Sequence, residues 1–246
     1  MEKKNIVLLG ASNSLMPGGL CAGLSQSNIN LYNLSIGGTD IVYRIYELKK
    51  EENQELIHKA DLIVLESNIM DSYMASGYSL KNLEFKVLQY MTYLYEELYS
   101  LKKKIVVLLL FDILCLCERE RKMANLVMKF HKKLTAFYGF NLIDVHQKML
   151  DTKCFKFYST HLDASHLLSS IMYQLGKNIS QNLASFEFTK KQLKPQTKAI
   201  FRILSPLDLM PHATPKYFKD LLYKDKYVEI SGGGGFDSFS KTIFRL

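Results

Sequence analysis

The sequence lacks most of the features that would assign it to a special class of protein. It has no tryptophan, only 5 prolines and only 4 cysteines among 246 residues. The cysteines lie in or beside apolar stretches with no regular spacing, which indicates reduced thiols and argues against a disulfide framework. Cys115 and Cys117 are too close together for both to join a zinc site of the CxxC type. We therefore expect a cytoplasmic protein in which Cys21, Cys115, Cys117 and Cys154 are reduced, with Cys115 and Cys117 as buried thiols.

Long apolar runs are also missing, and no stretch approaches the length of a membrane span. The opening MEKKNIVLLG has a basic tip, but its apolar run is too short for a signal peptide and no small-residue cleavage site follows. It is better explained as the first strand of a sheet. No metal or other cofactor is expected, because His58, His131 and His146 have no ligand-type residues at useful spacing.

What the chain does have is a basic charge and ample material for a core. The formal net charge is +8, but lysine and arginine are scattered among acidic residues rather than gathered in one block. We interpret this charge as favouring solubility and attraction of acidic substrates. Nucleic acid is not expected as a partner, since no zinc knuckle or RNP-like motif is present. A hydrophobic content of 48% can fill the interior of a folded domain.

Along the first 184 residues, segments with helical spacing of apolar residues alternate with short continuous apolar runs. Helical spacing over longer segments predicts helices at residues 39–58, 80–102, 118–138 and 163–183. Strands covered on both faces read as continuous apolar runs, and five such runs occur at residues 5–10, 29–35, 60–67, 104–111 and 140–145. This order predicts a parallel, doubly wound sheet between two helical layers, a three-layer α/β/α fold of flavodoxin-like type.

Small and polar residues gather where this fold would place a ligand. Crevices of doubly wound sheets lie outside the carboxyl ends of the strands. Four clusters fall at that predicted rim: GASNS after the first strand, SIGGTD after the second, ESNIMD after the third, and HLDASH before the last helix. Any one of them could be ordinary turn material. Four at the same edge indicate a site.

The segments GASNS, NLSIGGTD, LESN and DASH resemble the four sequence blocks of the SGNH/GDSL hydrolase family, in the family's order, over residues 5–183. The resemblance implies that Ser12 is the nucleophile and that Gly38 and Asn68 are oxyanion-hole donors. It implies that Asp163 and His166 complete a catalytic triad.

Three positions depart from the family pattern. Ala11 replaces the usual acidic residue before the nucleophile, Ser35 replaces a glycine of the second block, and Ile69 replaces the usual aspartate after Asn68. None of these changes removes a reacting group. They indicate a divergent branch, so the substrate does not follow from the resemblance.

The chemistry of these residues supports the same assignment independently. A serine hydroxyl needs a base to take its proton, and His166 has the side chain that titrates near neutrality. Asp163 would hold the imidazole tautomer, and it could also cap the helix that follows. Ser14 could replace Ser12 as the nucleophile, although Ser12 lies nearer the strand end. His161 could contact the substrate or simply lie in a surface loop.

An oxyanion must be met by donors that are already in place. The backbone N–H of Ser12 is one candidate, and the side-chain amide of Asn68 is another. Gly38 is a third, because a residue without a Cβ lets the main chain approach an acyl group closely.

The tail has a different character. Helical spacing fades after residue 184, where we place a domain boundary between a catalytic domain, residues 1–184, and an appendage, residues 185–246. Four prolines interrupt the appendage, and its four consecutive glycines lack the Lys-Ser/Thr pair of a P-loop. Short strands are expected at residues 198–204, 227–231 and 242–246. The appendage could pack on the first domain, cover its crevice, or belong to a longer protein.

The sequence therefore predicts a serine esterase that acts through an acyl-enzyme on an O-acyl group, most simply an acetyl group on a carbohydrate. An O-acetyltransferase would share the first half-reaction. A lipase or thioesterase is a further alternative, and a catalytically silent carbohydrate-binding or scaffolding protein is another. The complete set of Ser, Gly, Asn, Asp and His residues argues against a silent protein.

Overall fold

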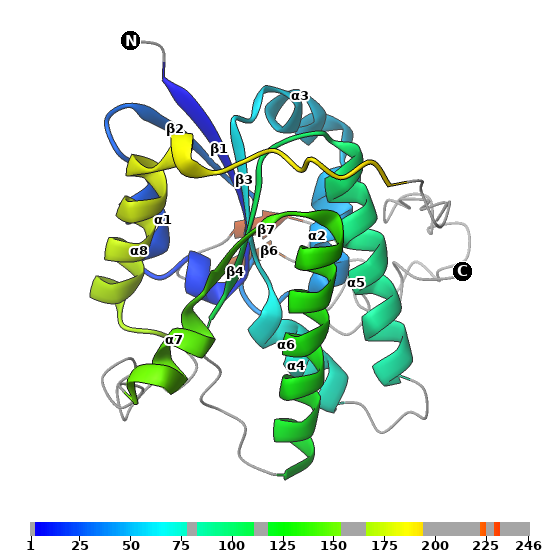
Figure 1. The fold of residues 1–246 in the computed structure, drawn as a ribbon. Coiled ribbons are helices and arrows are strands. Elements are labelled where there is room, and N and C mark those ends of the chain that lie inside the picture. Colours follow the sequence, from blue (N-terminus) through cyan, green and yellow to red (C-terminus); the bar gives the residue numbers. More distant parts are fainter. Residues whose placement is uncertain are drawn as a thin grey trace. The chain divides into compact units, whose positions relative to one another are not determined.

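A five-stranded parallel sheet forms the centre of the first of two compact units. The computed structural model describes residues 3–77, 83–110, 118–153, 166–193, 222–224 and 229–231. The strand order is β2-β1-β3-β4-β5, the doubly wound order in which the chain reverses direction across the sheet beside β1 (Figure 1). The predicted three-layer fold is confirmed. The strands are β1 (Lys4–Leu9), β2 (Ile29–Asn33), β3 (Leu62–Glu66), β4 (Ile105–Leu109) and β5 (Asn141–Asp144).

The inner strands are buried on both faces, as their continuous apolar sequences predict. Every residue of β3 and β4 is buried, and so are the last four residues of β1. Successive side chains of a strand point to opposite faces, so covering both faces requires an unbroken apolar run. Glu66, at the end of β3, is the one charged residue in the runs LIVLE and IVVLL.

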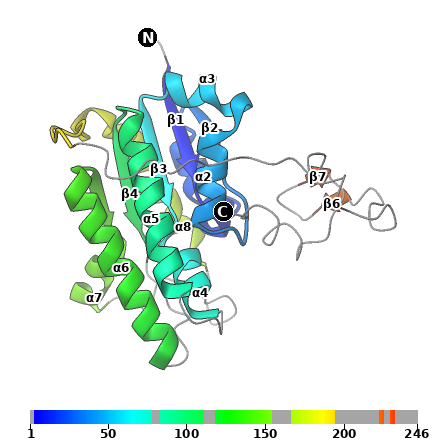
Figure 2. The same cartoon turned by 90° about the vertical axis from the view of Figure 1, so that its right-hand side faces the viewer.

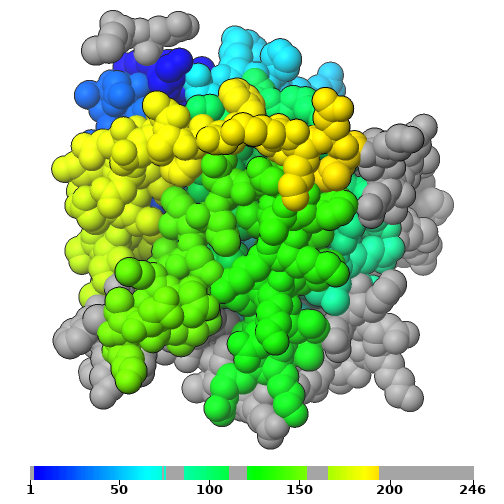
Figure 3. All heavy atoms as spheres, viewed as in Figure 1, coloured from blue at the N-terminus to red at the C-terminus, as the bar shows by residue number. Residues whose placement is uncertain are grey.

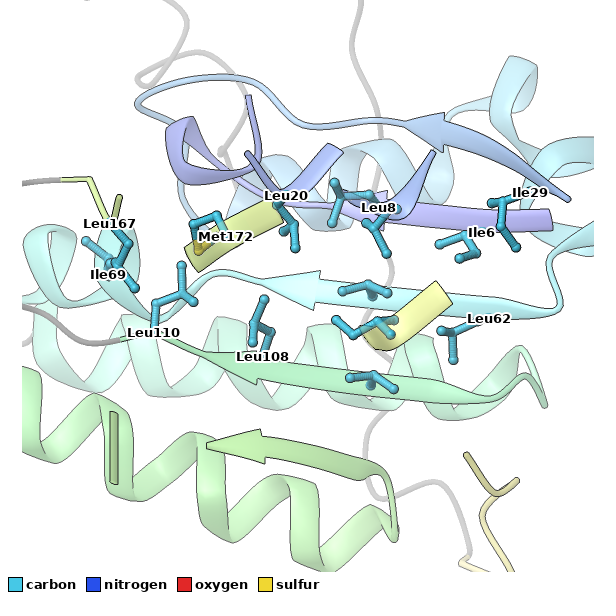
Figure 4. Packing of buried hydrophobic residues seen from close by; sticks show 14 of the residues in the cluster. Ile6, Leu8, Leu20, Ile29, Leu62, Ile69, Leu108, Leu110, Leu167 and Met172 are labelled. Atoms are coloured by element: carbon cyan, nitrogen blue, oxygen red, sulfur yellow. The ribbon is translucent and has the colours of Figure 1, made fainter. Parts of the chain in front are cut away.

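Helices cover the two faces unequally. On one face, α1 (Leu20–Leu24) lies against α8 (Ser169–Gln181), and α7 (Val145–Thr152) lies next to β4. Figure 4 shows the apolar cluster under these helices, which includes Leu8 of the sheet, Leu20 of α1 and Met172 of α8. The other face carries more helices, and Figure 2 shows three of them, α4, α5 and α6, side by side. This layer contains α2 (Ile41–Lys49), α3 (Glu51–Lys59), α4 (Asn68–Gly77), α5 (Leu83–Ser100) and α6 (Glu118–Tyr138).

The helices differ from the sequence prediction in three ways. The helix expected over residues 163–183 begins at Ser169, with Leu168 rather than Asp163 at its N-cap position. The helix expected over residues 39–58 is two helices, because the backbone at Lys50 is extended (φ −62°, ψ 126°). Three helices were not predicted at all. α1 is only five residues long, too short to show a helical period, while α4 and α7 begin directly after strands in segments that contain small or polar residues.

Residues 186–193 extend the first unit beyond the expected boundary at 184. The Asn141 side chain bonds the backbone of Glu187 in both directions, and the Tyr99 hydroxyl bonds the backbone of Lys191 and Leu193. Figure 3 shows this segment lying across the surface next to β5 and α6. The first compact unit therefore runs over Met1–Thr197 and the second over Lys198–Leu246.

The second unit contains one described hairpin. β6 (Leu222–Lys224) pairs antiparallel with β7 (Glu229–Ser231). β7 coincides with the strand expected at 227–231, while β6 was not expected. The strands expected at 198–204 and 242–246 lie outside the described residues. In the part of the chain that the structure describes, no helix has the length and apolar character needed to cross a membrane.

Candidate active site at the carboxyl ends of the strands

The chain leaves β1 through a tight turn that presents Ser12. We call residues 10–15 the serine turn. Its centre is a short 3-10 helix, Ser12–Ser14, closed by a bond from the Leu15 N–H to the Ser12 carbonyl at 2.9 Å. Gly10 is required here, because a Cβ at this position would lie 2.0 Å from the Ser14 Oγ. The glycine that follows the first strand therefore leaves room for the Ser14 side chain inside this turn.

The two serines of the turn have different surroundings. Ser12 is partly exposed, whereas Ser14 is fully buried. The Ser14 hydroxyl donates to Oε2 of Glu66 at 3.0 Å, so it is already engaged inside the protein. Of the two nucleophiles considered from the sequence, Ser12 is the one a substrate could reach.

A direct hydrogen bond joins the serine turn to the segment that contains His166. The Leu167 N–H donates to Oδ1 of Asn13 at 3.1 Å, across 154 positions of the sequence. Asn13 and Leu167 are both buried, and His166 is partly exposed beside them. The neighbours of Ser12 and His166 are thus bonded to each other. Asp163 and His161 lie outside the described residues.

Close packing of α1 on α8 supports this junction. A Cβ on Gly23 would lie 2.0 Å from the Tyr173 carbonyl oxygen, and one on Gly176 would lie 2.4 Å from the Leu20 carbonyl oxygen. The two helix backbones therefore approach each other at glycines. Since α8 begins two residues after Leu167, this contact holds the His166 segment against the serine turn.

We predict that Gly23→Ala destabilises the protein by about 1–3 kcal/mol, because the new methyl group would collide with backbone atoms of α8. Urea unfolding followed by circular dichroism measures the change. Gly37→Ala is the matched control, since a Cβ there would meet only ordinary contacts at 3.9 Å. Equal stability of the two variants would contradict the close packing of these helices.

The loop after β2, residues 35–40, also reaches the serine turn. We call it the glycine loop. A Cβ on Gly37 would lie 3.9 Å from the Cβ of Ser12, so this glycine faces the proposed nucleophile. Gly38 has φ of +71°, in the left-handed region, and a Cβ there would meet nothing within 4 Å. Its backbone conformation, rather than crowding within the protein, is what favours glycine at position 38.

Arg44 holds the glycine loop from inside the protein. This buried side chain, 1% exposed, donates through Nη1 to the Thr39 and Asp40 carbonyl oxygens, each at 2.6 Å. Its Nη2 reaches the Glu66 carbonyl oxygen at 3.4 Å. Asp40 caps α2 by accepting from the Val42 N–H. Burial raises the pKa of Asp40, the nearby Asp71 adds to the rise, and Arg44 opposes it.

Asn68 is the first residue of α4 and is fully buried. Its Nδ2 donates to the Leu110 carbonyl and its Oδ1 accepts from the Leu110 N–H, both at 2.9 Å. The amide thus ties the end of β3 to the end of β4. An amide nitrogen carries two hydrogens, so only the second could serve an oxyanion.

Among the described residues, no group of three or more His, Cys, Asp or Glu side chains could hold a metal ion. His131 is instead buried in a polar network, with Nε2 3.1 Å from Oδ2 of Asp71 and Nδ1 3.0 Å from the Tyr95 hydroxyl. Sequence reasoning missed this network, as it missed Arg44 and Glu66. The available signal was a charged residue inside or next to an apolar run, because such residues are seldom buried without partners.

This chain is similar to known proteins in structure but not in sequence. No protein-family model matches the sequence, and no curated protein matches it. A lipase/acylhydrolase from Enterococcus faecalis is similar with a TM-score of 0.59 at 16% identity, over 76% of this chain and 100% of that one. A catalytic mutant of an acetylxylan esterase from Geobacillus stearothermophilus gives a TM-score of 0.56 at 14% identity, over 78% and 99% of the two chains.

A member of the lipolytic G-D-S-L family from Veillonella parvula is similar in the same way. Its TM-score is 0.56 at 16% identity, over 74% of this chain and 98% of that chain. The chain described here therefore has the fold of the SGNH/GDSL hydrolases. The resemblance carried by the four sequence blocks is confirmed for the fold.

Proposed function

We propose that this protein is a carboxylic ester hydrolase that removes an O-acyl group, an acetyl group on a carbohydrate, with Ser12 as its nucleophile. The observation that carries the proposal is the bond between Asn13 and Leu167, which joins the immediate neighbours of Ser12 and His166. Solved structures with this fold include an acetyl xylan esterase and an acetylxylan esterase from Geobacillus stearothermophilus.

In the proposed reaction the Ser12 oxygen attacks the ester carbonyl while His166 takes the hydroxyl proton. The tetrahedral intermediate collapses, His166 returns the proton to the leaving alcohol, and an acyl-enzyme remains. Water then attacks this ester with His166 again as the base, which releases the acid and restores the Ser12 hydroxyl. Asp163 would orient the imidazole and stabilise its protonated form.

The negative charge on the carbonyl oxygen would be met by N–H groups on three segments. The Ser12 N–H lies in the serine turn, the Gly38 N–H lies in the glycine loop, and Asn68 has one N–H beyond the one it gives to Leu110. Each such donor is worth about 10²–10³ in turnover in other hydrolases. The acyl group would lie beside Gly37, where a Cβ would come no closer than 3.9 Å to the side chains of Ser12 and Leu15.

The proposal predicts that a fluorophosphonate probe labels the full-length protein once, at Ser12. The labelled site is identified by digestion and peptide mass spectrometry. Acetylated xylooligosaccharides, p-nitrophenyl acetate and p-nitrophenyl palmitate then serve as substrates, with and without a sugar acceptor. Release of acetate from the sugars supports the proposed substrate.

The other outcomes each point to a different assignment. Acetate transfer to an added sugar in preference to water would identify an O-acetyltransferase. A preference for the palmitate ester would identify a lipase. Labelling at Ser14 or at no serine would contradict the proposed nucleophile, and binding of sugars without turnover would identify a silent carbohydrate-binding protein.

A further inference from the structure

We propose that Glu66 is a positioning residue for the nucleophile, acting from the neighbouring strand in place of the acidic residue that the sequence lacks at Ala11. The inference rests on the proposed function of Ser12. It concerns a buried carboxylate that makes no contact with substrate in the proposed mechanism and that holds the turn from which Ser12 projects.

The contacts of Glu66 are directed at both sides of Ser12. Its Oε2 accepts from the Ala11 N–H at 2.9 Å and from the Ser14 hydroxyl at 3.0 Å. The register of the sheet places Leu9 opposite Leu65, so the chain leaves β1 directly beside Glu66. One oxygen atom thus fixes the residue before Ser12 and the second residue after it. Rotation of the turn would break both bonds.

The same residue is connected to the glycine loop. The Glu66 carbonyl oxygen accepts from Nη2 of Arg44 at 3.4 Å, and Arg44 in turn holds the carbonyl oxygens of Thr39 and Asp40. Glu66 therefore lies between the two segments that would supply the Ser12 and Gly38 N–H groups. A small shift of either segment would misplace a donor, because an oxyanion hole works only when its donors are fixed in advance.

The surroundings of the carboxylate indicate a role beyond filling space. Glu66 is 0% exposed, and among the described residues its Oε1 has no hydrogen-bond partner. Burying a carboxyl group is costly unless it is well bonded, and an apolar side chain would fill the end of β3 at lower cost. The benefit we infer is rigidity of the serine turn.

The test separates the position of the acceptor from its charge. Glu66→Gln keeps an oxygen at the same distance and is expected to keep kcat within about tenfold of the wild type. Glu66→Asp keeps the charge but withdraws it by one methylene, so the carboxylate should no longer reach either donor. Glu66→Leu removes the acceptor. We expect kcat to fall about 100-fold in the Asp and Leu variants, with KM changed less than about threefold.

Glu47→Leu is the matched control. Glu47 is a buried glutamate of α2 whose carboxylate accepts from Nδ2 of Asn53 in α3, so it tests the loss of a buried carboxylate elsewhere. It should lower the melting temperature without lowering the rate of fluorophosphonate labelling at Ser12. The Asp and Leu variants of Glu66 should slow that labelling even where they melt like the control.

Two results would overturn the inference. One is a folded Glu66→Leu protein that labels and turns over at the wild-type rate. The other is an Asp variant that is at least as active as the Gln variant, because this would mean that charge rather than position matters. This second result decides the question if Glu66→Leu does not fold. Failure of the proposed function is recognised separately, because Ser12 of the wild type would then not react with the probe at all.

Discussion

Ser12→Ala and His166→Ala are each expected to lower kcat by about 10⁴-fold or more, and the double variant should lose little more than either one. The reason is that the two side chains act in one step. Ser12 cannot attack without losing its proton, and His166 has no function in the first step without a hydroxyl to deprotonate. Initial rates on p-nitrophenyl acetate and on acetylated xylooligosaccharides measure both losses.

One control lies in the serine turn and the other lies in α3, away from it. Ser14→Ala removes a buried hydroxyl that donates to Glu66, so it should cost no more than about tenfold in kcat. His58→Ala changes an exposed histidine at the far end of β3 and should have no effect on rate. Equal losses in Ser12→Ala and Ser14→Ala, or additive losses in the double variant, would contradict a shared proton transfer.

The fold could be predicted from the sequence because the signal for it is long and repeated. Five continuous apolar runs alternate with helical segments, and each run is a strand within one or two residues of the predicted limits. The split at Lys50 could not be predicted, because that residue has no turn-forming character and its extended backbone depends on the packing of α2 and α3.

Only part of the candidate site could be predicted from the sequence. Ser12 and Gly38 stand in short motifs at strand ends, where small residues are conspicuous. Glu66 also lies in a strand-end motif, but neither its position nor that of Arg44 reveals a role, because both residues act through bonds to residues 22 to 55 positions away. Asn13 likewise reads as turn material until its bond to Leu167 is seen. Long-range pairings of this kind depend on the topology of the sheet rather than on local pattern.

The buried histidine of α6 leads to the second large effect. His131 lies between Asp71 of α4 and Tyr95 of α5, and Asp71 also accepts from the Ile41 N–H at the start of α2 at 2.9 Å. Tyr95 continues the chain to the Thr135 hydroxyl at 3.1 Å. One nitrogen of a neutral imidazole donates and the other accepts, so the His131 ring can bond the Asp71 carboxyl group and the Tyr95 hydroxyl at the same time.

Replacing His131 by leucine should therefore lower the free energy of unfolding by about 3–5 kcal/mol, because Asp71 would stay buried after losing its partner. Urea unfolding measures the loss. Tyr95→Phe should lower the free energy of unfolding by about 1 kcal/mol, since it removes only neutral hydrogen bonds. His58→Leu, at an exposed position, should leave it within about 0.5 kcal/mol of the wild-type value. In Asp71→Asn/His131→Leu the carboxylate is gone, so the two losses should not add. Fully additive losses would mean that the pair is not coupled and that His131 stabilises the helices through packing alone.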